Sequence, residues 1–399
     1  MNPKKTIAII GGGASALSFA CSIDTTKFDV TIYEKNTTLG RKFLVAGSGG
    51  FNLTHSENAN DFIKRYTPSH FMAPFINRFT NVDFRAWLLT IGIETYVGTS
   101  KRVFPKKGIK PIQVLQAIET ALQKNTIKIA YEHTWLGFEN ELLHFKTKQS
   151  NVLIKADYKV FALGGASWKV TGSNTEWLNY FKEKNITTLP FQSSNSAFEV
   201  KWGFELLKQI ESKAIKNAMF SCENKQHKGE AVVTAFGIEG SGVYPLSSFV
   251  REQLNHNGKA IVTIDFKPDL TLEEVKQRLI NNSQLSTKDI LEKKINLTST
   301  HIALLKAQTT KEQYQSVDYL SKLIKIYPIT IIGLAPLDEA ISTAGGICLS
   351  SINADLELKE LPSYYCMGEM LNWDAPTGGY LLQACFSMGY TLANKFNKE

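Results

Sequence analysis

The sequence contains few cysteines. Five cysteines are scattered over 399 residues, and no two of them form a Cys-x-x-Cys pair. This pattern argues against a zinc site, a disulfide framework and a flavoenzyme that relays electrons through a dithiol. The seven histidines are scattered as well, so we expect no metal site. The five thiols are expected to be reduced core residues in a cytoplasm.

Long apolar segments are also missing. No apolar run reaches the length of a membrane span. The first expected strand begins at residue 6, which leaves no room for a signal peptide. We therefore expect a cytoplasmic protein without a membrane partner. The chain shows no internal repeat or low-complexity segment, and its length suits two or three structural units.

Charge of one sign is in moderate excess, with 45 lysines and arginines against 37 acidic residues and a net charge of +8. A solvated surface explains this balance, and so does a polyanionic partner such as RNA; we expect no DNA partner. Two segments carry many cations, the lysine-rich region 271–326 and a turn at 100–110. The turn is either a solvated corner or an anion contact, and its cations are Lys101, Arg102, Lys106, Lys107 and Lys110.

The strongest motif lies near the N-terminus. Residues 7–10 form a short apolar run typical of a buried parallel strand. Gly11-x-Gly13-x-x-Ala16 follows at once and opens a helical pattern. Strand, glycine turn and helix in this order indicate a dinucleotide-binding fingerprint. Gly11 permits the tight turn, Gly13 lets the backbone approach a pyrophosphate, and Ala16 lets the helix pack on the strand.

A carboxylate completes this fingerprint. A second expected strand at 28–33 ends in Glu34, about 20 residues beyond the glycines. A carboxylate there accepts hydrogen bonds from both ribose hydroxyls and repels a 2′-phosphate. The site is therefore predicted to bind a dinucleotide other than NADP.

A glycine-rich loop follows at residues 46–56. Four small residues in a row, 47–50, would let the backbone approach a flat or phosphorylated ligand. Asn52 and Thr54 could hydrogen-bond that ligand, and Arg41 and Lys42 could offset phosphate charge. The alternative is a flexible surface loop.

The middle of the chain shows mixed patterns. Helical spacing covers residues 60–95 and 111–122. Strand-like runs follow at 127–131, 143–146, 152–154 and 159–163. The last run leads into Gly164-Gly165. This glycine pair predicts a second close approach of the backbone to the same ligand.

From about 190 to 335 the pattern changes. Antiparallel strands are expected at 198–200, 231–234 and 260–264, with a turn at 237–242, and helices at 271–326. The chain then returns to glycine-rich turns. A strand is expected to end at Gly368-Glu369, followed by a loop with Asp374. A helix begins at Thr377-Gly378-Gly379, and its positive end could face a phosphate or a flavin edge.

Several of these blocks carry a family resemblance. The chain resembles the BaiN-like (aminoacetone-oxidase-type) flavoproteins, relatives of the glutathione-reductase superfamily. The matching blocks lie at both ends of the chain and together are highly specific; they are 9–17, 47–57, 102–105, 162–168 with 171–173, and 368–383. Many relatives carry Arg-Cys-Asn where this chain has Gly50-Phe51-Asn52, so a substrate is not transferred across that gap.

The resemblance implies an α/β fold with a discontinuous Rossmann-like FAD-binding domain. That domain would comprise 1–190 and 335–399. A β-rich inserted domain (191–268 with 327–334) and a helical inserted unit (269–326) would interrupt it and contact the substrate. FAD would be held non-covalently by Gly11, Gly13, Ala14, Ser15, Ala16, Glu34, Lys35, Arg41, Lys42, Gly49, Asn52, Gly164, Gly165, Glu369, Asp374, Thr377, Gly378 and Gly379.

Three functions fit these features. One is a reductase whose FAD takes hydride from NAD(P)H and passes it to an electron-poor C=C bond in a small molecule or in ribosomal RNA. The others are an oxidase of a small amine and a non-catalytic flavoprotein or RNA-binding module. No second Gly-x-Gly-x-x-Gly motif appears, so NAD(P)H would dock transiently. The expected proton donors or acceptors are His55, Lys42 and Tyr380; nothing in the sequence indicates the oligomeric state.

Overall fold

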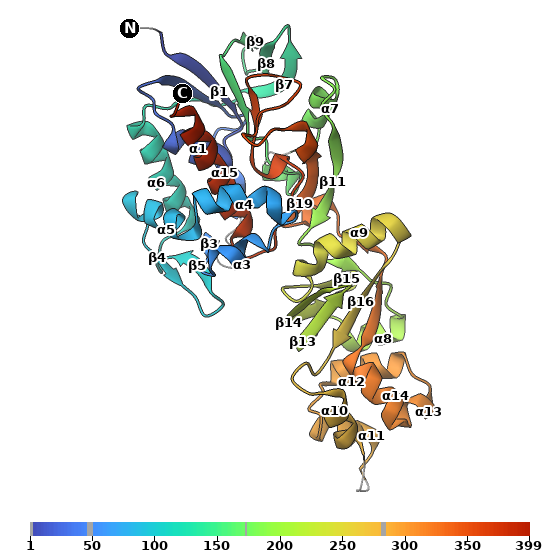
Figure 1. The fold of residues 1–399 in the computed structure, drawn as a ribbon. Helices are drawn as coiled ribbons and strands as arrows, with labels where there is room; N and C mark the ends of the chain where they lie inside the picture. Colours follow the sequence, from blue (N-terminus) through green and yellow to red (C-terminus); the bar gives the residue numbers. More distant parts are fainter. Residues whose placement is uncertain (1–2, 46–50, 172–173, 281–284) are drawn as a thin grey trace. The chain divides into compact units, whose positions relative to one another are not determined.

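A computed structural model describes residues 3–45, 51–171, 174–280 and 285–399 (Figure 1). By its internal contacts the chain divides into two compact units. The first unit comprises Met1–Gln192 and Ile341–Glu399, and the second comprises Ser193–Ala340. In the described part of the chain, no helix combines the length and apolar composition that crossing a bilayer requires.

A five-stranded parallel sheet forms the centre of the first unit. Its order is β20-β10-β1-β2-β6, and every neighbouring pair is parallel. The loops that follow β1 and its two neighbours therefore meet at one edge, where doubly wound folds bind their ligands. The strands are β1 (Lys5–Ile10), β2 (Phe28–Tyr33), β6 (Lys128–Ala130), β10 (Tyr158–Phe161) and β20 (Tyr364–Cys366).

Two helices from opposite ends of the sequence pack together in this unit. Helix α1 (Ala14–Ser22) follows β1, and α15 (Tyr380–Phe396) ends the chain; they lie side by side in Figure 1. A Cβ on Gly389 of α15 would lie 2.4 Å from the Ser15 carbonyl oxygen, so glycine is what permits this close approach. The C-terminal segment thus belongs to the nucleotide-binding fold.

Shorter elements complete the first unit. The predicted helical region 60–95 is confirmed by α3, α4 and α5, and the predicted helix at 111–122 by α6. The helices are α2 (Arg41–Val45), α3 (Ala59–Ile63), α4 (Ser69–Arg78), α5 (Asn81–Thr90), α6 (Pro111–Lys124) and α7 (Trp177–Lys182).

Three small sheets accompany these helices. Two are antiparallel and have the orders β3-β5-β4 and β7-β8-β9, and a third pairs β11 with β19. The strands are β3 (Thr54–His55), β4 (Thr95–Val97), β5 (Arg102–Pro105), β7 (Thr134–Glu139), β8 (Leu142–Lys146), β9 (Asn151–Ile154), β11 (Thr188–Ser194) and β19 (Ser342–Ile347).

The second unit is built on a seven-stranded sheet in the order β17-β16-β13-β14-β15-β12-β18. Its neighbouring strands are antiparallel, as predicted. The strands are β12 (Phe198–Glu199), β13 (Ala214–Cys222), β14 (Lys225–Val233), β15 (Gly237–Glu239), β16 (Ala260–Asp265), β17 (Tyr327–Ile331) and β18 (Gly333–Leu334).

The predicted turn at 237–242 is wrong in its first half, because Gly237–Glu239 is strand β15. A Cβ on Gly237 would lie 1.9 Å from the Phe198 carbonyl oxygen. Glycine here allows β12 to come close and does not mark a turn.

The helices of the second unit share one core with its sheet. They are α8 (Phe204–Ile210), α9 (Ser247–Asn257), α10 (Leu272–Leu279), α11 (Thr287–Lys293), α12 (Ser299–Ala307), α13 (Lys311–Gln315) and α14 (Val317–Lys325). One hydrophobic cluster includes Phe220 of the sheet as well as Leu291 and Leu305 of the helices. The contacts therefore do not separate a helical unit at 269–326, and the chain crosses between units after Gln192 and Ala340.

Candidate functional site

The first glycine turn joins β1 to α1. Gly11 has a φ of +97°, and a Cβ there would lie 2.5 Å from the Ala162 carbonyl oxygen. A side chain is therefore excluded by the backbone conformation and by the neighbouring chain. The Gly12 N–H donates to Glu34 Oε2 at 2.8 Å, which fixes the turn to the end of β2.

Helix α1 begins directly after this turn with its N-terminus open. Gly13 is its N-cap and supplies no side-chain cap. A Cβ on Gly13 would have only one neighbour within 4 Å, the Ala162 carbonyl oxygen at 3.9 Å. The first N–H groups of a helix have no intrahelical partner, so the segment Ala14–Ala16 presents donors next to Gly13, where no described side chain lies within 4 Å of the added Cβ. This arrangement fits the predicted pyrophosphate contacts.

Glu34 is buried at the end of β2. Its Oε1 accepts hydrogen bonds from the Asn36 N–H at 2.8 Å and the Asn36 side-chain amide at 2.6 Å. Arg41 Nη1 donates to Asn36 Oδ1 at 2.8 Å, and burial lowers the pKa of the half-buried Lys35. The predicted adenosine-side residues thus form one connected group. Glu34 Oε2 accepts one hydrogen bond among the described residues, from the Gly12 N–H, so its second lone pair leaves room for a ribose hydroxyl.

A second glycine turn follows β10. Gly164 has a φ of +74°, and a Cβ on Gly165 would lie 2.5 Å from Cδ of Glu369. Glu369 is buried and accepts hydrogen bonds from the Gly165 N–H at 3.3 Å and the Thr343 N–H at 3.1 Å. The predicted residues Gly164, Gly165 and Glu369 are therefore brought together from distant parts of the chain.

Lys42 belongs to this second turn. Its Nζ donates to Ser167 Oγ at 3.1 Å and lies 3.4 Å from Glu369 Oε2. The ammonium thus bridges the loop after β10 and the segment after β20. It carries protons that can be transferred, and a third of its side chain is exposed.

The C-terminal loop lies at the start of α15. Asp374 is buried and exchanges two backbone hydrogen bonds with Thr67, at 2.7 and 2.9 Å. The helix begins at Tyr380, three residues after the predicted start at Thr377, because Gly378 and Gly379 have φ values of +112° and +99°. A residue in the left-handed region does not continue a right-handed helix. The preceding strand likewise ends at Cys366 and not at Gly368-Glu369.

Gly379 is also held close to another strand. A Cβ there would lie 2.6 Å from the Thr54 Cα. The glycine-rich loop is thereby joined to α15, and Thr54 Oγ1 donates to Gln383 Oε1 at 2.7 Å. Gly49 lies outside the described residues.

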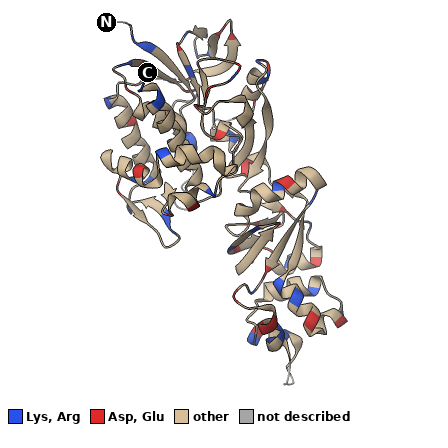
Figure 2. Cartoon of the chain, in the orientation of Figure 1, with Lys and Arg blue, Asp and Glu red and all other residues tan. Residues whose placement is uncertain are grey.

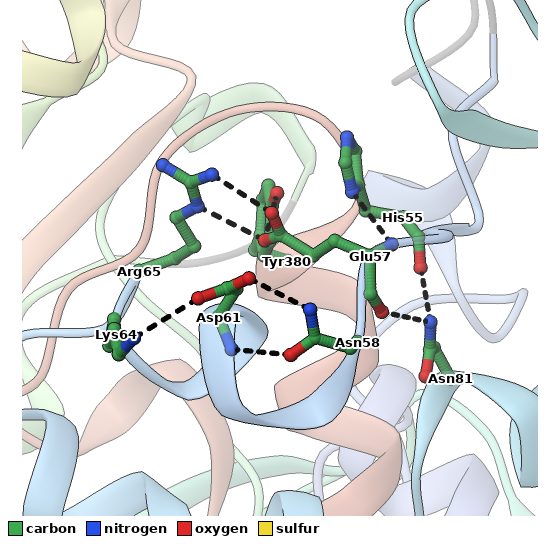
Figure 3. A network of polar contacts seen from close by, with 8 residues as sticks. All are labelled: His55, Glu57, Asn58, Asp61, Lys64, Arg65, Asn81 and Tyr380. Atoms are coloured by element: carbon green, nitrogen blue, oxygen red, sulfur yellow. Dashed lines mark hydrogen bonds and ion pairs between the residues drawn. The ribbon is translucent and has the colours of Figure 1, made fainter.

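A polar network surrounds Tyr380, as Figure 3 shows. The Tyr380 hydroxyl donates to Glu57 Oε1 at 2.6 Å. Arg65 donates two hydrogen bonds to the same carboxylate, from Nε to Oε1 at 3.0 Å and from Nη2 to Oε2 at 2.9 Å. Burial acts to raise the pKa of Glu57, but Arg65 and Tyr380 outweigh it and hold that pKa below its usual value. Glu57 is thus kept as a carboxylate.

His55 stacks on Tyr380, with ring centroids 5.2 Å apart and 22° between the planes. Its Nδ1 accepts a hydrogen bond from the Glu57 N–H at 3.3 Å. Burial lowers the pKa of His55, with smaller contributions from Arg65 and Arg102, against the opposing effect of Glu57. Burial and the Glu57 carboxylate raise the pKa of Tyr380. His55 is therefore neutral and Tyr380 protonated at neutral pH.

Of the three predicted proton donors or acceptors, the structure brings His55 and Tyr380 together and places Lys42 with Glu369. The sequence did not single out Glu57 or Arg65. Glu57 and Arg65 lie 8 positions apart, and Glu57 lies 323 positions from Tyr380. No motif links residues at such separations. His55 and Glu57, two apart on one extended segment, carried the only local signal.

Asn52 supplies a test of whether this region suits a cofactor. Its Oδ1 is buried and has no hydrogen-bond partner among the described residues. Buried polar atoms without partners are rare, and a cofactor N–H would satisfy this one. The residues present therefore fit FAD. Over the same residues, no group of three His, Cys, Asp or Glu side chains is arranged to hold a metal ion.

Comparison with known proteins gives a consistent result. The family model described as "HI0933-like protein Rossmann domain" matches residues 5–395. The chain belongs to this family. It is 22% identical to the 3-dehydro-bile acid delta(4,6)-reductase of Clostridium scindens, covering 96% of this chain and 97% of the relative. It is also 22% identical to the ribosomal RNA dihydrouridine synthase of Haemophilus influenzae, with 98% of each chain covered.

A solved structure shows the same fold. The 3-ketosteroid-delta4-(5alpha)-dehydrogenase of Rhodococcus jostii RHA1 matches with a TM-score of 0.51 at 11% identity, over 98% of this chain and 97% of that one. These findings confirm the predicted α/β Rossmann fold and the predicted family. This HI0933-like member is an FAD-dependent flavoprotein of the oxidoreductase class.

Proposed function

We propose that this protein reduces an electron-poor C=C bond that is conjugated to a carbonyl group in a ring. The observation that carries the proposal is the ordered group His55, Tyr380, Glu57 and Arg65 beside the glycine turn that opens α15. The names of two relatives support it, since a delta(4,6)-reductase and a dihydrouridine synthase both add hydrogen to a C=C bond.

FAD, when bound, supplies hydride chemistry at N5 of its ring system. Residues Gly11 to Ala16 would hold the pyrophosphate and Glu34 the adenosine ribose. Gly164, Gly165 and Asn52 would lie along the flavin. NAD(P)H would reduce the flavin by docking transiently.

The remaining task of the protein is to supply a proton and to position the substrate. His55 and Tyr380 are held by Glu57, so we assign them to positioning. Tyr380 is a poor acid in this setting, because its hydroxyl donates to the Glu57 carboxylate, and loss of the proton would leave a phenolate facing that negative charge. Lys42 carries transferable protons and is partly exposed, and we propose it as the acid that protonates the second carbon.

Ribosomal RNA and a small molecule remain the two substrates to separate. The excess positive charge lies in the first unit, which has 27 lysines and arginines against 20 acidic residues; the second has 18 against 17. In the turn at 100–110, Lys106 pairs with Glu94 at 3.0 Å, whereas Lys101, Lys107 and Lys110 have no carboxylate partner among the described residues. These cations favour RNA as the substrate.

A salt titration tests the RNA proposal. Each phosphate contact on a single strand should contribute about −0.7 to the log–log slope of affinity against salt. Changing Lys101, Lys106, Lys107 and Lys110 to glutamine should flatten this slope. The control changes four exposed lysines of the same unit, Lys146, Lys148, Lys182 and Lys184. Equal slopes in wild type and both variants would move the proposal to a small-molecule substrate.

Anaerobic reduction tests the proposed reaction. Purified protein is reduced with NADH or NADPH without oxygen and is then mixed with 2-cyclohexen-1-one, with a uridine-containing RNA fragment, or with air. Rapid reoxidation by a C=C acceptor supports the proposal. Reoxidation by air alone, with hydrogen peroxide formed, would identify an oxidase. A flavin that no reductant reduces would indicate a non-catalytic flavoprotein.

A further inference from the structure

Arg102 carries a guanidinium group that has no acceptor partner among the described residues. It is the first residue of β5 and lies opposite His55 in the β3–β5 ladder. Arginine has five N–H donors, yet within the described ranges no carboxylate or other acceptor receives one from the Arg102 side chain. The other arginines of the region are occupied, Arg65 by Glu57 and Arg41 by Asn36.

The Arg102 side chain lies against the glycine turn at the start of α15. A Cβ on Gly378 would lie 3.3 Å from Arg102 Nε and 3.9 Å from its Cγ. Any side chain at Gly378 would therefore press on the arginine. His55 is the cross-strand neighbour of Arg102. Because directly opposed side chains lie on the same face of a sheet, the side chains of His55 and Arg102 share one face. The guanidinium is thus part of the His55–Tyr380 group.

The charges of this group leave Arg102 uncompensated. Glu57 is the carboxylate of the network, and Arg65 already neutralises it through two hydrogen bonds. His55 is neutral because its pKa is lowered by burial. What remains is one positive guanidinium beside the open, positive end of α15. Such a place favours an oxygen atom that gains negative charge.

We propose that Arg102 binds the carbonyl oxygen of the substrate and stabilises the negative charge that this oxygen gains during reduction. The inference rests on the proposed function, because it assigns a residue to the reduction of a conjugated C=C bond. Arg102 contacts the reacting system and is therefore a catalytic residue, whereas Glu57 and Arg65 position their neighbours.

The electron balance shows why a cation is needed. Hydride from the reduced flavin forms a C–H bond at the β-carbon, and the electron pair of the C=C bond moves to join the α-carbon and the carbonyl carbon. The carbonyl π pair moves onto oxygen, which becomes an enolate. A proton then reaches the α-carbon and the carbonyl re-forms, so the substrate gains two electrons and two protons and the flavin is oxidised.

A stable phenolate tests this assignment without turnover, because it places a negative oxygen on a flat ring as the enolate does. Binding of 4-nitrophenolate to the oxidised holoenzyme is measured by equilibrium dialysis in wild type, Arg102→Gln, Arg102→Lys and the control Arg78→Gln. Arg78 is exposed at the end of α4 in the same unit. Removal of Arg102 leaves no carboxylate of the described residues unpaired, so the variants should fold and retain FAD. Their visible spectra report whether FAD is bound.

We expect Arg102→Gln to weaken phenolate binding by about tenfold to a hundredfold, the range for one charge-assisted hydrogen bond. Arg102→Lys should lose less, since it keeps the charge, and Arg78→Gln should bind like wild type. Unchanged binding in Arg102→Gln, an equal loss in Arg78→Gln, or no binding by wild type would each overturn the inference.

Single-turnover reoxidation by 2-cyclohexen-1-one separates the two proposals. If phenolate binding depends on Arg102 but only oxygen reoxidises the wild-type flavin, the oxyanion site stands and the proposed reduction falls. If wild type reduces the enone and Arg102→Gln does so at the same rate, the proposed function stands and the role of Arg102 falls.

Discussion

The two units of this protein use glycine and buried charge in different ways. Among the described residues, thirteen glycines have positive φ, and eleven of them lie in the first unit. The three buried carboxylates, Glu34, Glu369 and Asp374, lie there too. The second unit instead fills its interior with one large apolar cluster. A positive φ is open mainly to glycine, and a buried charge costs stability. We therefore infer that the first unit, which concentrates both, is the one that binds the ligand.

Surface charge follows the same division. The second unit is almost neutral, and Figure 2 shows basic and acidic residues interspersed over its helices. Many of these form ion pairs within or between neighbouring turns, such as Lys293 with Asp289 at 2.9 Å. The lysine-rich appearance of 271–326 therefore reflects solvated helices. In the first unit, Arg102 of β5 and the nearby Lys101, Lys107 and Lys110 have no carboxylate partner among the described residues.

Matched glycine substitutions should give the largest contrast between the units. Gly11→Ala should lower FAD affinity at least about a hundredfold, because its Cβ would lie 2.5 Å from a carbonyl oxygen. Gly258→Ala shares the positive φ, at +69°, but its Cβ would meet nothing within 4 Å. It should cost about 1 kcal/mol of stability and leave FAD affinity unchanged. Flavin fluorescence measures the affinities, and equal losses would remove the distinction.

Acid should destabilise the second unit through His301. This residue is buried on α12, its Nε2 has no hydrogen-bond partner in the described structure, and burial lowers its pKa from 6.5 to about 4. Because the folded pKa lies below the unfolded one, the unfolded chain takes up a proton first. Stability is therefore fully present above the unfolded value and falls as pH decreases from about 6.5 to 4, by roughly 2 kcal/mol at pH 5.

Hydrogen exchange measured by mass spectrometry between pH 6.5 and 4 reports the stability of the second unit separately from that of the first. His301→Gln removes the titrating ring and should flatten the pH dependence there. A slope that persists in His301→Gln would assign the acid sensitivity to another group.

Breaking one ion pair in each unit should give the smallest contrast. Arg65→Met should cost about 1–2 kcal/mol, since it leaves the Glu57 side chain, only 10% exposed, without its cation. Lys228→Met should cost less than about 0.5 kcal/mol, because Lys228 and Asp269 are 46% and 77% exposed. Urea unfolding compares the two variants. A larger loss for Lys228→Met would contradict the view that the more buried of these two ion pairs contributes more to stability.

The sequence was sufficient where the signal was local. The strand, glycine turn and helix from Ile7 to Ala16 follow one another directly, and Glu34 comes at a fixed spacing, so these elements were predicted correctly. The strand β15 was not, because the close neighbour that requires Gly237, the backbone of β12, lies about forty positions earlier. From the sequence alone, a glycine in a turn cannot be distinguished from a glycine in a strand that lies close to another backbone.

The candidate site was predictable only in part for the same reason. His55 and Tyr380 could be named as polar residues in matching blocks, but their partners Glu57 and Arg65 depend on how β3 and α15 meet. Nor did the sequence indicate that the Arg102 guanidinium has no acceptor among the described residues. Whether a cation is paired depends on the positions of every carboxylate around it, which no spacing in the chain expresses.

We propose that hydride passes from NAD(P)H through FAD to a C=C bond, and isotope transfer tests this most directly. Enzyme is reduced without oxygen by NADPH deuterated at the nicotinamide C4, or by the matching NADH, and is then mixed with a uridine-containing RNA fragment or with 2-cyclohexen-1-one. Mass spectrometry should find a saturated product that carries deuterium on carbon. A reduced flavin that leaves both acceptors unchanged and transfers its electrons only to oxygen would contradict the account.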